Sequence, residues 1–235
     1  MGFSIMVCPM IRIRIAVLAL ATGMSPALAA PIEVALVENV MGAPAGVKLM
    51  DYVETGKTIQ LASSDGIVLS YLSSCVRESI AGAGIVTIGI EQSEVQGGRV
   101  ARSEVACDAG KMVLEGNKPA QFAGRIFRGA AAGKSAPEPQ LVLYGRSPLV
   151  ELKAPGALLI ERLDQTSERY LVDVASEHLL HGKFYDFARW GRDLAAGGLY
   201  RISLDGQGVV FKIDPSAKPG NTPIVGRLLR FGSSR

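Results

Sequence analysis

Hydrophobic and polar residues alternate with a period of two in many short segments of the chain, and this pattern predicts β-strands. In the first half these segments are residues 57–62, 67–72, 85–90 and 99–105. Ser64-Asp65-Gly66 separates the first two segments and favours a hairpin between them. Gly82 and Gly84 predict a break before the third segment, and Gly97-Gly98 is the predicted reversal before the fourth.

The same pattern returns in the second half, at residues 141–144, 157–163, 169–174, 199–204 and 209–213. Tyr170, Val172 and Val174 share one face of their predicted strand. Asp205-Gly206 between the last two segments predicts a hairpin. Residues 184–194 are the one segment whose pattern also allows a short helix.

Many short strands without a long helical period indicate an all-β protein. Residues 128–140 are rich in Ala, Gly and Pro, which is typical of a linker. We therefore predict an antiparallel β domain over residues 31–127 and a second, β-sandwich-like domain over residues 141–235. A chain of 235 residues with 48% hydrophobic residues is large enough to bury two cores.

Residues 1–29 resemble an export signal. Arg12 and Arg14 precede a short apolar run at residues 15–21, and Ala27-Leu28-Ala29 has the small-x-small pattern that signal peptidase accepts. A membrane anchor would need about 20 apolar residues, whereas Gly, Ser and Pro interrupt this run after residue 22. The pattern predicts a periplasmic protein with no membrane span after cleavage, and leaves open whether Met1 or Met10 starts the chain.

The charge balance gives no reason to expect nucleic acid or anionic lipid as a partner. The whole chain carries a formal charge of +3, and removal of Arg12 and Arg14 with the signal leaves basic and acidic residues nearly balanced. Such a chain lacks the strongly basic surface that these ligands require.

Export changes the interpretation of the cysteines. With Cys8 removed, only Cys75 and Cys107 remain, and an even pair in an oxidising compartment predicts a disulfide. The alternative is two separate buried thiols. A metal site is disfavoured because the chain has no Cys-x-x-Cys pair.

The catalytic motifs are all incomplete, so we expect no catalytic, cofactor-binding or metal-binding residue. Residues 129–135 lack the spacing of a phosphate-binding loop, and residues 145–149 lack the second Gly of a nucleophile elbow. His178 and His181 have no third ligand in view, and Leu179-Leu180 between them favours a partly buried strand. A pair of carboxylates in space stays open. Its candidate members are Glu54, Glu78, Glu91, Glu94 and Glu104.

An aromatic cluster surrounds the single Trp of the chain. Tyr185, Phe187 and Trp190, together with Phe184, could contact a sugar or a protein partner. Alternatively, these rings form the core of the second domain. Both interpretations stay open on sequence grounds.

Gly56-Lys57-Thr58-Ile59, followed by paired β segments around Asp65-Gly66, resembles the FecR-like domain of bacterial extracytoplasmic proteins. The resemblance covers about residues 35–115. The cysteine frame SYLSSC…VACDAGK and the closing segment LAAGGLYRISL…FKIDPSAKPGNTPIVGRLLRF are also similar to uncharacterised exported proteins, over the whole mature chain. The resemblance implies an all-β periplasmic module used in sensing, regulation or envelope contacts. It does not extend to the membrane helix and cytoplasmic region of FecR-type regulators, so neither their transmembrane relay nor a ligand carries over.

These observations predict a non-enzymatic binding or regulatory module that contacts a partner protein or an envelope ligand through loops and exposed sheet edges. The alternative is a hydrolase that acts on an envelope polymer with a carboxylate pair.

Overall fold

The structure is a computed structural model that describes residues 2, 32–109, 111, 137–165 and 168–231. Within these ranges the protein is all-β, with two single turns of 3-10 helix, η1 (Ser176–His178) and η2 (Ile224–Gly226), so the predicted fold class is confirmed. The predicted signal segment, except for Gly2, and most of the predicted linker lie outside the described residues. Residues 31–235 form one compact unit.

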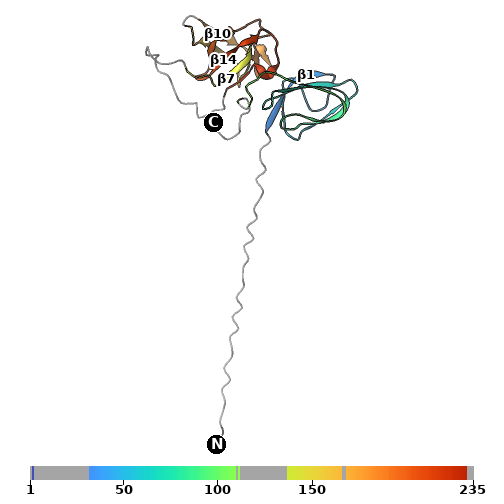
Figure 1. The fold of residues 1–235 in the computed structure, drawn as a ribbon. Coiled ribbons are helices and arrows are strands. Elements are labelled where there is room, and N and C mark those ends of the chain that lie inside the picture. Colours follow the sequence, from blue (N-terminus) through green and yellow to red (C-terminus); the bar gives the residue numbers. More distant parts are fainter. Residues whose placement is uncertain (1, 3–31, 110, 112–136, 166–167, 232–235) are drawn as a thin grey trace. The chain divides into compact units, whose positions relative to one another are not determined.

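The first sheet contains six strands, drawn from blue to green in Figure 1. These are β1 (Glu33–Met41), β2 (Tyr52–Glu54), β3 (Thr58–Leu61), β4 (Gly66–Tyr71), β5 (Val76–Thr87) and β6 (Glu94–Glu104). The strand order is β2-β1-β4-β5-β3, and β6 pairs with β5, all antiparallel. Every residue of β4 is buried, as expected for the strand between β1 and β5.

Strand β5 pairs with three other strands because it changes direction at a group of glycines. Its first half pairs with β4 and its second half with β3, and the register with β6 shifts between Ala81 and Gly84. Gly97 and Gly98 have φ values of +77° and +64°, which residues with a side chain rarely adopt. A Cβ atom on Gly98 would also lie 3.0 Å from the carbonyl oxygen of Ala81.

The sequence-based prediction for these glycines was wrong. Gly97-Gly98 lie inside β6, and Gly82 and Gly84 lie inside β5, so none of them forms a reversal. The chain reverses instead at residues 88–93. Glycine is common both in turns and where two backbones approach closely. In β5 and β6 the four glycines mark a close approach of the two strands.

The predicted hairpin between residues 57–62 and 67–72 is also wrong, although both strands exist. β3 and β4 do not pair with each other, and each pairs with β5. The turn itself is as predicted, because the Asp65 carboxylate accepts a hydrogen bond from the amide of Ala62 at 2.9 Å. A second bond, from the amide of Ala43 at 3.2 Å, ties this turn to the segment after β1 rather than to β3.

Two further sheets follow. The five-stranded sheet has the order β10-β9-β13-β14-β7 and the four-stranded sheet the order β11-β12-β8-β15; β7, β10 and β14 are labelled in Figure 1. The strands are β7 (Leu141–Gly145), β8 (Leu149–Glu151), β9 (Gly156–Arg162), β10 (Arg169–Val174), β11 (Leu179–Leu180), β12 (Phe184–Asp186), β13 (Leu199–Leu204), β14 (Gln207–Lys218) and β15 (Leu228–Arg230).

Most strand predictions for this half are confirmed, including the hairpin of β13 and β14 and the partly buried strand at Leu179-Leu180. Two features differ. Pairs β14·β7 and β15·β8 are parallel, so these sheets are mixed rather than purely antiparallel. Residues 184–194 are not a helix, because Phe184–Asp186 pairs with β8 and turns follow it.

The core has three hydrophobic clusters. One lies within the first sheet, around Ile59, Leu69 and Val86. Another lies within the second half of the chain, around Ile160 and Phe211. The third draws residues from both sides of the predicted linker, and its members are Leu36, Met50, Leu72, Leu149, Phe184, Ile224, Val225 and Leu228. The division into two domains stays a prediction, and this third cluster adds apolar contacts between its two parts.

A polar cluster beside the third hydrophobic cluster joins the same two parts. The guanidinium of Arg230 lies over the ring of Tyr52, 4.4 Å from its centroid, in a cation–π contact. The Tyr52 hydroxyl donates to Glu151 at 2.8 Å, while Arg230 donates to Glu151 and to Glu33. Burial is the main cause that raises the pKa of Tyr52, so its hydroxyl keeps the proton that it donates.

The cysteine pair lies at the same junction. The sulfur atoms of Cys75 and Cys107 are at bonding distance, with Cα atoms 5.7 Å apart, as the sequence predicted. Beside them the amide of Val105 donates to the carbonyl of Cys75 at 2.9 Å. Asp108 then accepts the amide of Val142 in β7 at 2.9 Å. The disulfide therefore fixes the segment through which the chain leaves the first sheet.

We predict that Cys75→Ser lowers the free energy of unfolding by about 2 to 5 kcal/mol, because the open chain gains conformational entropy when unfolded. Denaturant unfolding of the oxidised protein and the variant measures this difference. Wild-type protein under reducing conditions serves as the control and should match the variant. Two free thiols in denatured, unreduced protein would contradict the disulfide.

Candidate functional site

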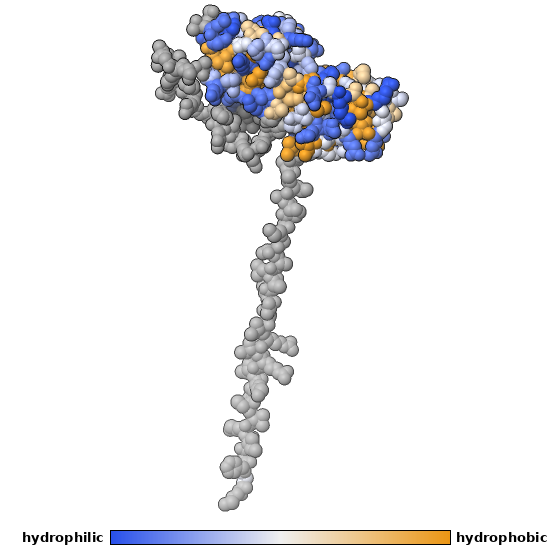
Figure 2. Space-filling view, viewed as in Figure 1, coloured by the Kyte–Doolittle hydropathy of each residue, from blue (hydrophilic) through white to orange (hydrophobic). Residues whose placement is uncertain are grey.

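The candidate site is a pocket beside strand β6. Its volume is about 440 Å³. It opens where the inner face of β6 meets the 88–93 loop, and its lining residues are Thr87, Ile88, Gly89, Gln92, Ser93, Glu94, Val95, Val100 and Arg102. Ile90 and Val100 expose 65% and 37% of their surface, so apolar side chains reach the surface next to this pocket. Figure 2 shows hydrophobic residues reaching the surface among hydrophilic ones.

Strand β6 is an edge strand of the first sheet among the described residues, since its only strand neighbour is β5. Residues 96–104 are all exposed. Because the amide of Val105 donates to Cys75, alternation along an antiparallel ladder turns the backbone groups of residues 103, 101 and 99 toward β5. The N–H and C=O groups of Val100 and Arg102 therefore point away from the sheet, and their side chains line the pocket.

The floor of the site is held by the fully buried carboxylate of Glu78. Arg102 Nε donates to Glu78 Oε1 at 2.6 Å, and the amide of Ser93 donates to the same carboxylate at 3.1 Å. A second nitrogen of Arg102 donates to the carbonyl of Ser93 at 2.7 Å. The side chain of Arg102 stays 38% exposed, so the pair joins the buried core to the wall of the pocket.

The 88–93 loop is also fixed from beneath. The hydroxyls of Tyr71 and Ser93 lie 2.7 Å apart, and burial is the main cause that raises the pKa of Tyr71 to about 12. Ser74 donates to the carbonyl of Glu91 at 2.6 Å. A loop held at both sides forms a preorganised wall, which lowers the entropy lost on binding.

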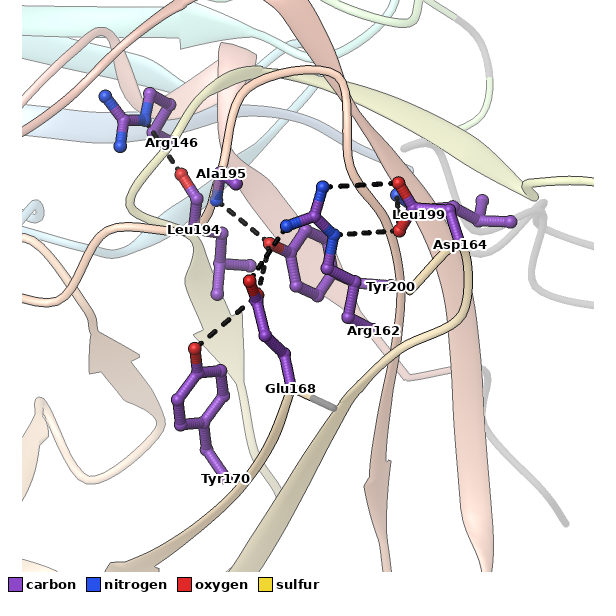
Figure 3. Close-up of polar contacts among 9 residues, drawn as sticks. All are labelled: Arg146, Arg162, Asp164, Glu168, Tyr170, Leu194, Ala195, Leu199 and Tyr200. Atoms are coloured by element: carbon purple, nitrogen blue, oxygen red, sulfur yellow. Dashed lines mark hydrogen bonds and ion pairs between the residues drawn. The ribbon is translucent and has the colours of Figure 1, made fainter. Parts of the chain in front are cut away.

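A second polar cluster lies around Arg162, at the end of β9 (Figure 3). Arg162 donates to Asp164 and to Glu168, both at 2.9 Å. The hydroxyl of Tyr200 accepts the amide of Ala195 at 2.9 Å and donates to Glu168 at 3.3 Å. Asp164 and Glu168 are thus two neighbouring carboxylates that share one arginine.

The electrostatics of this carboxylate pair bear on the alternative of a hydrolase. The hydrogen bond with Arg162 is the main cause that lowers the pKa of Asp164, so Asp164 stays ionised at neutral pH. In a glycosidase pair Asp164 would therefore be the base or nucleophile and not the proton donor. Of the five glutamates named from the sequence, Glu78 is bonded to Arg102 and Glu94 lines the β6 pocket, while Glu54, Glu91 and Glu104 are exposed.

A buried arginine organises the end of the four-stranded sheet. Arg227 is 1% exposed and donates to both oxygens of Asp186, at 2.6 and 3.2 Å. Ser147, the serine of the incomplete nucleophile motif, is fully buried and donates to Asp193. These groups satisfy one another, which is typical of a structural polar network.

The predicted aromatic contact residues separate into two kinds. Tyr185 and Phe187 are 4% and 2% exposed and belong to the core of the second half. Trp190 is 45% exposed, with its ring parallel to that of Tyr185 and edge-on to His178. Of the three residues, only Trp190 presents its ring to solvent.

The histidines are not arranged as metal ligands. His178 Nδ1 accepts the amide of Ala175 at 3.1 Å, and His181 lies in an exposed turn with a φ of +49°. Within the part of the chain that the structure describes, no three His, Cys, Asp or Glu side chains lie together as a possible metal site. Nor does any helix of these residues have the length and apolar character needed to cross a membrane.

Comparisons of the chain with protein-family models, curated proteins and solved structures gave no match. The resemblance to FecR-like domains therefore stays a prediction. The β6 pocket itself was not foreseen, because its lining comes from residues 87–102 and depends on a reversal at 88–93 rather than at Gly97-Gly98. The sequence carried no signal for the pocket, because the exposure of Ile90 and Val100 is evident only in the structure.

We predict that Glu78→Gln lowers the free energy of unfolding by about 1 to 3 kcal/mol, because the guanidinium of Arg102 loses a charged acceptor next to the core. Glu104→Gln, at an exposed position of β6, is the matched control and should change stability by less than about 0.5 kcal/mol. Denaturant unfolding at neutral pH compares the two. Equal stability of both variants would contradict a structural role for Glu78.

A further prediction concerns pH. Since the pKa of Asp164 is lower in the folded than in the unfolded protein, its contribution to stability is present above the ordinary Asp pKa of about 4 and is lost as pH falls through the folded value. Asp164→Asn should therefore lower stability at pH 7 and make the loss of stability below about pH 4 shallower. Parallel pH–stability curves for wild type and variant would contradict this.

Proposed function

We propose that the protein is an exported, non-enzymatic binding module that captures an extended segment of a partner protein along β6. The observation that supports this proposal is the coincidence of two features at the same residues. Val100 and Arg102 direct their backbone hydrogen-bonding groups away from the sheet, and their side chains line a pocket of about 440 Å³. An added strand gains main-chain hydrogen bonds from such an edge and side-chain selectivity from the pocket.

The chemistry of the pocket favours an apolar side chain of the bound segment. Ile88, Val95 and Val100 supply apolar wall, while the charge of Arg102 is balanced by Glu78. An ion pair whose carboxylate is buried and whose charges are already paired does not demand a charged ligand. The preferred ligand is therefore an extended peptide with an aliphatic or aromatic residue at the position that enters the pocket.

Export to the periplasm is part of the same proposal. It rests on the signal-like segment at residues 1–29 and on the cysteine pair at bonding distance, which persists in oxidising compartments. The resemblance of residues 35–115 to FecR-like domains supports a role in sensing or regulation at the cell envelope.

The proposal predicts that a photoreactive amino acid at Ser103, an exposed position of β6, forms a covalent adduct with one partner in cells. Val100→Pro in the same protein should abolish the adduct, because proline removes the outward N–H while sparing the bonds to β5. The same photoreactive residue at Lys212, on β14, which lies between β13 and β7, is the control and should give no such adduct.

Adducts of equal yield at Ser103 and Lys212, or an adduct that survives Val100→Pro in folded protein, would contradict the β6 site. Turnover of an envelope polymer that is abolished by replacing Asp164 or Glu168 would support the hydrolase instead. Circular dichroism of each variant confirms that it is folded.

A further inference from the structure

The second exposed edge of interest is strand β10, at the end of the five-stranded sheet. Its core face carries Val172 and Val174, which are 6% and 1% exposed. The opposite face carries Arg169, Leu171 and Asp173, all exposed. Leu171 is 72% exposed, which is unusual for leucine in the middle of an edge strand, where natural proteins generally place charges.

The backbone N–H and C=O groups of alternate residues in β10 point away from the sheet. The amide of Arg162 donates to the carbonyl of Glu168 at 2.9 Å. Along this antiparallel pair the backbone groups of residues 168, 170 and 172 therefore face β9, and those of Arg169, Leu171 and Asp173 face away. The structure describes no strand on this outer side of β10.

The order of side chains on this edge is self-complementary. In an antiparallel pair of two β10 strands centred on Leu171, Leu171 lies opposite Leu171 of the second copy. Arg169 lies opposite Asp173 of the second copy, and Asp173 opposite its Arg169. All these side chains lie on the same face of the joined sheets, so the pair has one apolar contact flanked by two ion pairs.

We propose that two copies of this chain associate through β10, with a twofold axis at Leu171, and so join their five-stranded sheets into one. The outward backbone groups of residues 169, 171 and 173 supply about six hydrogen bonds in this register. A two-residue slip in either direction places Leu171 opposite a charge and breaks both Arg169–Asp173 pairs. The charges therefore select this register as well as the partner.

The side chain of Arg169 is available for this role. It is 69% exposed, and its contact with Glu161 on the neighbouring strand is long, at 3.6 Å. Asp173 lies beside Ala157, which offers no charge. Exposed pairs of this kind are weak within one chain, so little is lost when Arg169 turns toward a second copy.

The size of the contact makes the association reversible. Six residues from each copy bury less surface than a stable dimer requires, so dimerisation is expected to depend on concentration. The β6 pocket is not involved, and a dimer through β10 presents two β6 edges. This gives an avidity gain for partners that carry repeated segments.

Cysteine crosslinking of residues 31–235 tests the register. In the proposed dimer Leu171→Cys brings two cysteines opposite each other about 5.5 Å apart between Cα atoms, within the range of a disulfide. Mild oxidation should give a covalent dimer in high yield. Asp173→Cys is the matched control, because its two copies lie about 14 Å apart along the strands. Comparable crosslinking of both variants would overturn the proposal.

Charge reversal tests the pairing without cysteine. Arg169→Asp and Asp173→Arg should each raise the dimer dissociation constant at least about tenfold, because both ion pairs become like-charge pairs. The double variant restores opposite charges and should recover dimerisation. Arg99→Asp, on β6, is the control for the charge change and should have no effect. Sedimentation of the wild type and these variants gives the constants. A wild-type chain that stays monomeric over the whole concentration range would overturn the proposal. A double variant whose dimer dissociation constant is no lower than those of the single variants would also overturn it.

Discussion

The close approach of β5 and β6 at four glycines is the constraint on which the first half of the protein depends. Gly82 and Gly84 on β5 lie against Gly97 and Gly98 on β6, so closely that a Cβ atom on Gly84 would lie 2.7 Å from a carbonyl oxygen of β6. The resulting bend lets one strand pair with β4 and then with β3. Beyond this bend, Val100 and Arg102 of β6 line one wall of the pocket together with Val95, which also packs against the core cluster of the first sheet.

Three arginine–carboxylate pairs join segments that are distant in the sequence. Glu78 is paired with Arg102, Asp186 with Arg227, and Glu151 with Arg230. In each pair one side chain is nearly buried. Such pairs add little net stability compared with apolar residues, but the removal of one partner is costly, so they favour one arrangement of the strands.

The sequence predicted strand positions well and strand pairing poorly. β10 and β13 have the predicted bounds because alternation is local information. Pairing depends on contacts between distant segments, so the glycines of β5 and β6 were assigned to turns, and β3 was paired with β4. The cysteine pair was predictable because Cys75 and Cys107 are the only cysteines beyond residue 29 in the sequence. The β6 pocket was not, because it exists only once the reversal is placed at residues 88–93.

The two exposed edges differ in what they can pair with, and the difference lies in the order of their charges. An antiparallel pair of two β6 strands centred on Arg102 would place two guanidinium groups opposite each other, each already held by Glu78. Like charges directly opposite are destabilising, so this register of β6 with its own copy is disfavoured. On β10 the charges alternate in sign around Leu171, and the same symmetry operation brings opposite charges together. In the two proposals the backbone pairing is common to both edges, so the order of the side chains along each strand is what distinguishes an edge for self-association from an edge for a different partner.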